Sequence, residues 1–285
     1  MNYGKHSNSK TFRGGGQSNL STITGIGAGS GPFRAAGKGI IKLGFTLAEV
    51  LITLGIIGVV AAMTMPTLIQ KNQEKVTITK LKKMYSILSQ AYLYAVEDNG
   101  TPDLWGFGNR DAGAEEDDVS YQANNSLIVR DKLFQNVKSL KKCDKALSKD
   151  ECGLSNTYYF ENKTVDSELN TKSSGVASID GSNIIVIANS GNCTEVRGTG
   201  KYLSNVCAII YLDINGSNAP NTHGKDIFSF YLTKNGIVPV GTQDETTWTF
   251  EKGSLGRTAW VIANENLDYL RCPKDLDWDG KTKCN

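Results

Sequence analysis

The most apolar stretch of the chain runs from Phe45 to Ile69 and has the length of a membrane-spanning helix. A hydrocarbon core of about 30 Å needs roughly 20 apolar residues of helix. A secretory signal has a shorter apolar core, about 7–15 residues, and ends at a small-residue cleavage site. The pattern therefore predicts a transmembrane helix over residues 45–69. A signal peptide cut near Ala61-Ala62 and an unprocessed signal anchor remain the alternatives.

After Pro66 the apolar positions take up helical spacing, with polar side chains between them. This is the i, i+3, i+4, i+7 pattern of an amphipathic helix with one buried face. Its members are Val76, Leu81, Met84, Tyr85, Leu88, Ala91, Tyr92 and Ala95. Residues 70–98 are therefore predicted to continue the helix and to pack on a sheet, and the turn pair Asn99-Gly100 ends it. Pro66 removes one backbone donor, so a kink or a locally melted turn is expected there.

Residues 99–285 are long enough to form one globular head with its own core. Their pattern predicts a second helix from Tyr121 to Lys142 and a short closing helix from Ala259 to Leu270. Runs typical of strands lie between the two helices: Thr157–Glu161, Val176–Ile179, Asn183–Ala188, Val206–Ile214, Ile227–Thr233, Gly236–Val240 and Thr246–Glu251. Turn clusters separate several of these runs, which favours antiparallel meanders. The predicted fold class is therefore α+β, a long N-terminal helix packed on a head with an antiparallel β-sheet.

Residues 1–44 form a leader that differs in composition from the rest of the chain. The leader contains six Lys or Arg, no Asp or Glu, and 11 of the 30 glycines. Such a segment cannot bury a core and is expected to be disordered. Its charge suits a cytoplasmic tail. Because five lysines follow the apolar stretch within residues 71–83, charge alone does not decide the orientation.

Glu49 is the one carboxylate inside the apolar stretch. An ionisable residue in a membrane helix costs about 2.5–3.5 kcal/mol even on lenient insertion scales, and such residues usually have a function. The alternative is that Glu49 lies one turn from the helix end and extends its carboxylate to the membrane interface.

The Gly44-Phe45 junction, the Thr-Leu-x-Glu that follows it and the late Pro66 together resemble the N-terminal signal of type IV pilins and type II secretion pseudopilins. The resemblance implies that a prepilin peptidase cuts after Gly44 and that the new amine of Phe45 is methylated. It also implies a pilin-like fold, in which Glu49 neutralises the amine of a neighbouring subunit during filament assembly. Pro66 belongs to the same assembly region.

The resemblance further implies the partners and the location of the protein. The partners are prepilin peptidase, other pilin or pseudopilin subunits, membrane lipid, and an inner-membrane assembly platform with its ATPase. The expected location is the bacterial inner membrane, crossed once with the head in the periplasm, or a periplasmic or surface filament.

Removal of the leader changes the formal charge from +2 to −4, since six positive charges leave with it. A mildly acidic mature chain argues against nucleic-acid binding.

All six cysteines lie in the expected head: Cys143, Cys152, Cys193, Cys207, Cys272 and Cys284. An even number in a translocated domain predicts disulfides. Six cysteines allow 15 pairings, and we expect nearest neighbours to pair. The spacings contain no C-x2-C pair, and His223 is the only histidine after the leader, so a zinc site is disfavoured. The Cys272–Cys284 loop also resembles the disulfide-bonded C-terminal region of many pilins.

Two acidic turns have spacings that suit a cation. Asp275, Asp277 and Asp279, followed by Gly280, match the first half of a calcium-binding loop, although no twelfth-position Glu follows. A solvated, disulfide-closed turn is the alternative. The second acidic turn begins at Asp213 and ends at Asp226, and could wrap a cation or form a long hairpin loop.

No motif of a known enzyme class occurs in the sequence, and no cofactor is required. The expected function is therefore structural, as a prepilin-like subunit of a type II secretion pseudopilus or a type IV pilus. A signal-anchored extracytoplasmic protein that binds a ligand and does not polymerise is the alternative from another class. A subunit of a DNA-uptake pilus is a third hypothesis. The sequence does not separate a secretion pseudopilus from a surface pilus.

Overall fold

A computed structural model describes residues 44–109, 120–137, 141–142, 154–155, 157–171, 174–177, 181–188 and 193–285. The predicted leader, apart from Gly44, lies outside the described residues. So do Cys143 and Cys152.

Helix α1 (Leu47–Asn99) begins close to the predicted position and ends where Asn99-Gly100 was expected to end it. It passes through Pro66 without a break, so no locally melted turn occurs there. A proline removes one backbone donor. Close to it, the Thr64 hydroxyl donates to the Val60 carbonyl at 3.0 Å, and the Thr67 hydroxyl donates to the Thr64 carbonyl at 2.9 Å.

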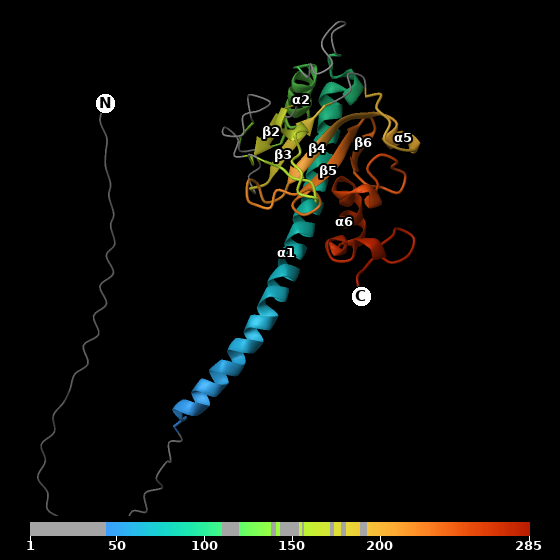
Figure 1. The fold of residues 1–285 in the computed structure, drawn as a ribbon. Coiled ribbons are helices and arrows are strands. Elements are labelled where there is room, and N and C mark those ends of the chain that lie inside the picture. Colours follow the sequence, from blue (N-terminus) through green and yellow to red (C-terminus); the bar gives the residue numbers. More distant parts are fainter. Residues whose placement is uncertain are drawn as a thin grey trace, which may run out of the picture. The chain divides into compact units, whose positions relative to one another are not determined.

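The second half of α1 packs on the head through the predicted apolar face (Figure 1). Its buried residues are Ile78, Leu81, Met84, Leu88, Ala91, Tyr92 and Ala95. The apolar pattern therefore predicted six of these seven positions and did not include Ile78. Val76, which it included, is 48% exposed, because it lies before the point where the helix meets the sheet.

The described strands form one antiparallel sheet in sequence order, which confirms the predicted meander. They are β1 (Lys141–Lys142), β2 (Ser174–Ala177), β3 (Asn183–Ile187), β4 (Val206–Asp213), β5 (Ile227–Thr233) and β6 (Gly236–Pro239). Asn235-Gly236 makes the tight β5–β6 turn, where Gly236 adopts a φ of 149° that side chains disfavour.

Both faces of the sheet are buried. On one face, side chains of β2–β5 pack with α1, with α2 (Ser120–Leu133) and with α6 (Thr258–Asn264). Tyr85 of α1 stacks on Phe230 at a ring distance of 5.5 Å. The alternate residues of the strands face a second cluster, where Tyr158, Leu169 and Val240 cover them. The strands are therefore apolar on both faces instead of alternating with polar residues.

Several boundaries differ from the sequence predictions. Helix α2 ends at Leu133 instead of Lys142, and residues 141–142 form β1. The expected strand at 157–161 is a pair of isolated bridges at Tyr159. The prediction of a strand at 246–251 is wrong. The Glu245 carboxylate accepts the Trp248 N–H, and the chain bends at residues 246–248.

The expected closing helix is also split in two. It ends at Asn264, and Glu265 adopts a left-handed φ of 54° before a short 3-10 turn. The remaining short elements are η1 (Pro102–Leu104), α4 (Glu168–Thr171), α5 (Gly200–Leu203), η2 (Phe250–Lys252), η3 (Ser254–Arg257), η4 (Asp268–Leu270) and η5 (Pro273–Asp275).

Candidate functional site

The predicted cleavage junction lies directly before α1. Gly44 and Phe45 have no regular secondary structure, and the Phe45 side chain is 87% exposed. A Cβ placed on Gly44 would meet no atom within 4 Å. Among the described residues, nothing therefore packs on this junction.

Glu49 and Thr46 cap the first turn of α1 reciprocally. The Thr46 N–H donates to the Glu49 carboxylate at 2.8 Å, and the Glu49 N–H donates to the Thr46 hydroxyl at 3.2 Å. This is a capping box, which satisfies two helix-terminal donors and places a negative charge at the positive end of the helix. The T-x-x-E spacing of Thr46 and Glu49 signals such a cap, a role that the cost of a charge in an apolar stretch does not indicate.

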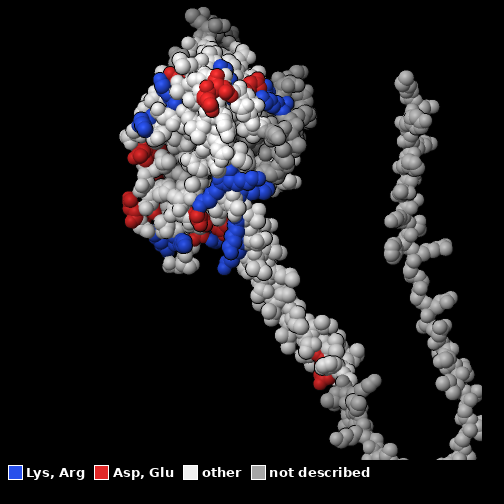
Figure 2. All heavy atoms as spheres, turned by 180° about the vertical axis from the view of Figure 1, so that it is seen from behind, with Lys and Arg blue, Asp and Glu red and all other residues white. Residues whose placement is uncertain are grey.

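The part of α1 between Glu49 and the head carries exposed apolar side chains. All of the large aliphatic residues from Val50 to Ile69 are exposed by 42% or more. An 18-residue window of this helix has a mean hydropathy of 2.2, and none of its residues is buried. By length and composition, the helix could therefore span a membrane. On the face shown in Figure 2, Lys, Arg, Asp and Glu gather on the head, whereas this helical segment is mostly white. Lipid or other helices would have to cover such a surface in water.

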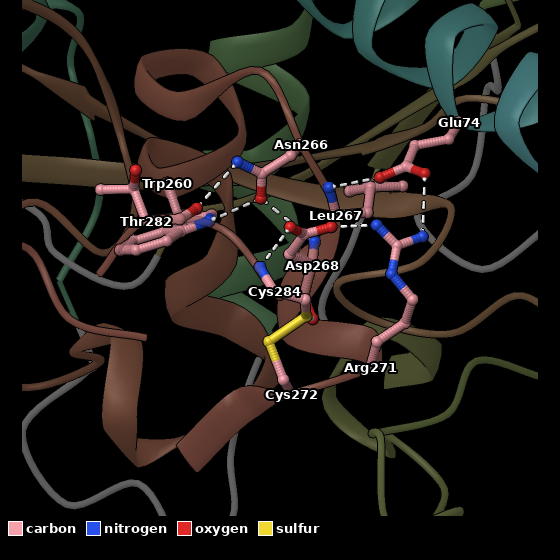
Figure 3. Close-up of a disulfide and its surroundings, with 9 residues drawn as sticks. All are labelled: Glu74, Trp260, Asn266, Leu267, Asp268, Arg271, Cys272, Thr282 and Cys284. Carbon is pink, nitrogen blue, oxygen red and sulfur yellow. Dashed lines mark hydrogen bonds and ion pairs between the residues drawn. A yellow bond between two sulfur atoms is a disulfide. The ribbon is translucent and has the colours of Figure 1, made fainter. Parts of the chain in front are cut away.

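Hydrogen bonds to charged side chains connect α1 with the C-terminal region, residues 266–284 (Figure 3). Glu74 of α1 accepts the Leu267 N–H at 2.7 Å and an Arg271 guanidinium N–H at 3.2 Å. Arg271 also pairs with Asp268, which accepts the Cys284 N–H at 2.7 Å. The residues that hold this end of the chain are therefore widely separated in sequence, and no local pattern indicated them.

The disulfide Cys272–Cys284 closes this C-terminal region, and Cys193–Cys207 ties β4 to the segment before it. Both pairs agree with the nearest-neighbour prediction. The third expected pair, Cys143–Cys152, lies outside the described residues.

The structure does not bring the predicted calcium ligands Asp275, Asp277 and Asp279 together. Asp277 accepts the backbone N–H of Asp279 at 2.9 Å, while Asp279 accepts from Gln243 at 3.1 Å. Within the described part of the chain, no three His, Cys, Asp or Glu residues are grouped so that they could hold a metal. Calcium in this turn therefore stays a sequence prediction.

His223 lies in the core. Its Nε2 atom is 2.9 Å from the Asp166 carboxylate, and its ring packs on Phe160 and Tyr211. Both members of the pair are buried, His223 with 1% and Asp166 with 3% exposed. This environment is that of a structural histidine.

Two surface hollows could hold a small ligand. One, of about 550 Å³, is lined by Phe160, Trp248 and the Gly253–Gly256 segment. The other, of about 490 Å³, lies between Tyr85 and Tyr92 of α1, Tyr202, and the β5–β6 turn. Both are within the size range of small-molecule sites.

A family model described as a family of unknown function, DUF6613, matches residues 67–256, about two thirds of the chain. No curated protein matches, and no solved structure matches. The matched range begins after the junction, Glu49 and Pro66, so it covers most of the head and the second part of α1.

Proposed function

The chain belongs to DUF6613, a family of unknown function, and we propose that it is a prepilin-like structural subunit of a type II secretion pseudopilus or a type IV pilus. In this proposal a prepilin peptidase removes residues 1–44 and methylates Phe45. The helix then polymerises laterally with other subunits, assisted by an inner-membrane platform and its ATPase. The head remains in the periplasm or on the filament surface.

One arrangement supports this proposal most. An exposed Gly44-Phe45 junction lies directly before a helix whose first turn holds Glu49 and whose large aliphatic side chains from Val50 to Ile69 are exposed. Hydrolysis of the Gly44–Phe45 peptide bond creates a cationic amine on Phe45. That amine and the Glu49 carboxylate are both costly in hydrocarbon when they are alone, and a pair of them in neighbouring subunits removes much of that cost.

The test substitutes Glu49 by Gln in the full chain. Gln removes the charge but can still serve in a capping box, so insertion and the start of the helix should be preserved. We expect filament yield, or secretion in the parent organism, to fall at least about tenfold, because one lost charge pair in apolar surroundings is worth more than about 1.4 kcal/mol.

Glu97→Gln is the matched control, since Glu97 is an exposed carboxylate on the same helix. It should leave assembly unchanged. Normal filaments from Glu49→Gln, with normal membrane insertion, would contradict the proposal.

The two hollows of the head favour a second candidate, a membrane-anchored protein that binds a ligand and never polymerises. That protein would keep its junction intact and would be insensitive to Glu49→Gln. Its head would bind a small molecule as a monomer, which a ligand-induced rise in the melting temperature would detect.

A further inference from the structure

Basic side chains gather where α1 leaves its apolar stretch and meets the head. Lys71 and Lys75 are exposed on α1 itself. Lys225 and Arg271 belong to the head, and both line a hollow of about 180 Å³ whose other wall includes Gln70 and Gln73 of α1. We call Lys71, Lys75, Lys225 and Arg271 the basic cluster.

The position of the basic cluster along α1 corresponds to the headgroup layer of a membrane. The apolar stretch ends at Ile69. With a rise of 1.5 Å per residue, Lys71 lies about 3 Å and Lys75 about 9 Å beyond that end. A bilayer of about 40–45 Å with a hydrocarbon core of about 30 Å has a headgroup layer of roughly 5–7 Å on each side. Long lysine side chains can extend their ammonium groups into this layer.

The charge of this cluster is not neutralised within the protein. Among the described residues, Lys71, Lys75 and Lys225 form no ion pair. Arg271 pairs with Glu74 and Asp268, whose side chains are only 14% and 8% exposed. These two carboxylates are therefore already bonded and leave the three lysines without an anion. Figure 2 shows Lys and Arg, with some Asp and Glu between them, at the end of the head where α1 emerges.

The surroundings of the cluster favour a phospholipid over a soluble anion. The exposed aliphatic side chains of α1 continue up to Ile69, directly before Lys71. Leu270, which is 39% exposed, lines the same hollow as Lys225 and Arg271. Cationic groups and apolar surface therefore lie side by side, as the phosphate and the acyl chains do in a lipid.

We propose that the basic cluster binds the headgroups of anionic phospholipids around α1. The lysines would contact the lipid phosphates as point charges, and the amides of Gln70 and Gln73 would add neutral donors. This binding would set the depth of α1 in the membrane and hold the base of the head at the membrane surface. The proposal rests on the membrane-spanning role of α1 and does not require polymerisation.

The test counts the lipids that remain bound to the full chain, by mass spectrometry of the intact protein released from nonionic detergent. The probes are phosphatidylglycerol, which is anionic, and phosphatidylcholine with the same acyl chains, which has no net charge. We expect the wild type to bind phosphatidylglycerol at least about tenfold more tightly, since each basic residue adds to the attraction. The preference should shrink in about 0.5 M NaCl, because salt screens exposed charges.

The double variant Lys71→Gln with Lys75→Gln should lose most of this preference. Both lysines are exposed, so the fold should be preserved. Lys201→Gln with Lys234→Gln is the matched control, because it removes the same charge from exposed positions of the head. Both control residues lie beside Tyr92, about 25 Å further along α1 than Lys75. The control should bind lipid as the wild type does.

Three results would overturn the proposal while leaving the membrane span intact. They are equal binding of the two lipids by the wild type, an equal loss of preference in the control, and displacement of phosphatidylglycerol by an equal concentration of glycerol 3-phosphate. The last result would mean that the cluster recognises a free phosphate anion. A wild type that retains neither phospholipid would overturn the membrane-spanning role of α1 together with this proposal.

Discussion

At the scale of single residues, Glu49 shows how one side chain can satisfy two different requirements. In the structure its carboxylate closes a capping box with Thr46. In the proposed mature protein the same carboxylate faces the amine of a neighbouring subunit. The position of Glu49 in the sequence suggested this pairing with a neighbouring amine, because an unpaired acid in an apolar stretch is costly. The capping role follows from the spacing to Thr46.

Glu74 is a residue whose importance could not be predicted from the sequence. It lies among other polar residues of α1, and its partners Leu267 and Arg271 are almost 200 residues away. Glu74→Ala leaves the mostly buried Leu267 N–H without its acceptor, so we expect a loss of about 1–3 kcal/mol in the free energy of unfolding. Thermal unfolding in detergent measures the change.

Glu97→Ala serves as the comparison for Glu74→Ala, since Glu97 is exposed on the same helix. It should change the stability by less than about 0.5 kcal/mol. Equal effects of the two substitutions would mean that Glu74 does not anchor the C-terminal region.

At the scale of secondary-structure elements, long periodic segments were predicted well and long-range contacts were not. The apolar stripe of α1 and the Asn235-Gly236 hairpin carry their signal within a few residues, and both occur in the structure. The expected strand near residue 246 failed because a buried carboxylate, Glu245, organises that segment through the Trp248 and Gly241 N–H groups. A propensity pattern contains no information on such tertiary hydrogen bonds.

The apolar face of α1 gives a matched pair of leucines. Leu81 is 0% exposed against the sheet, whereas Leu93 is 65% exposed on the same helix. Leu81→Ala should destabilise the protein by about 2–5 kcal/mol because it creates a cavity, and Leu93→Ala by less than about 0.5 kcal/mol. Chemical denaturation of both variants tests the assigned orientation of α1, and similar losses would contradict it.

The C-terminal disulfide closes a loop with a sequence separation of 12. Replacing both Cys272 and Cys284 by Ser should cost about 2–4 kcal/mol, because the crosslink restricts the unfolded chain. In oxidising buffer, the double variant should therefore melt at a lower temperature than the wild type. In reducing buffer, where the wild type also lacks the disulfide, the two proteins should melt at the same temperature. An unchanged melting temperature in oxidising buffer would show that the Asp268 and Glu74 contacts alone hold this region.

At the scale of the whole molecule, the prepilin-like motif and the family match lie in different parts of the chain. The family match spans residues 67–256 and carries no known function. The motif that resembles prepilins lies before it, at residues 44–49, and provides the basis for the proposed function. The α+β class, the long apolar helix and the antiparallel sheet follow from local patterns.

The central claim is that the chain is cut after Gly44 and methylated at Phe45. Intact mass and N-terminal sequencing of the protein extracted from the membrane of its natural host test it most directly. The proposal predicts a mature chain that begins at Phe45 and carries one additional methyl group. An uncut chain, or one that begins near Met63, would contradict it and would favour an anchored or secreted binding protein.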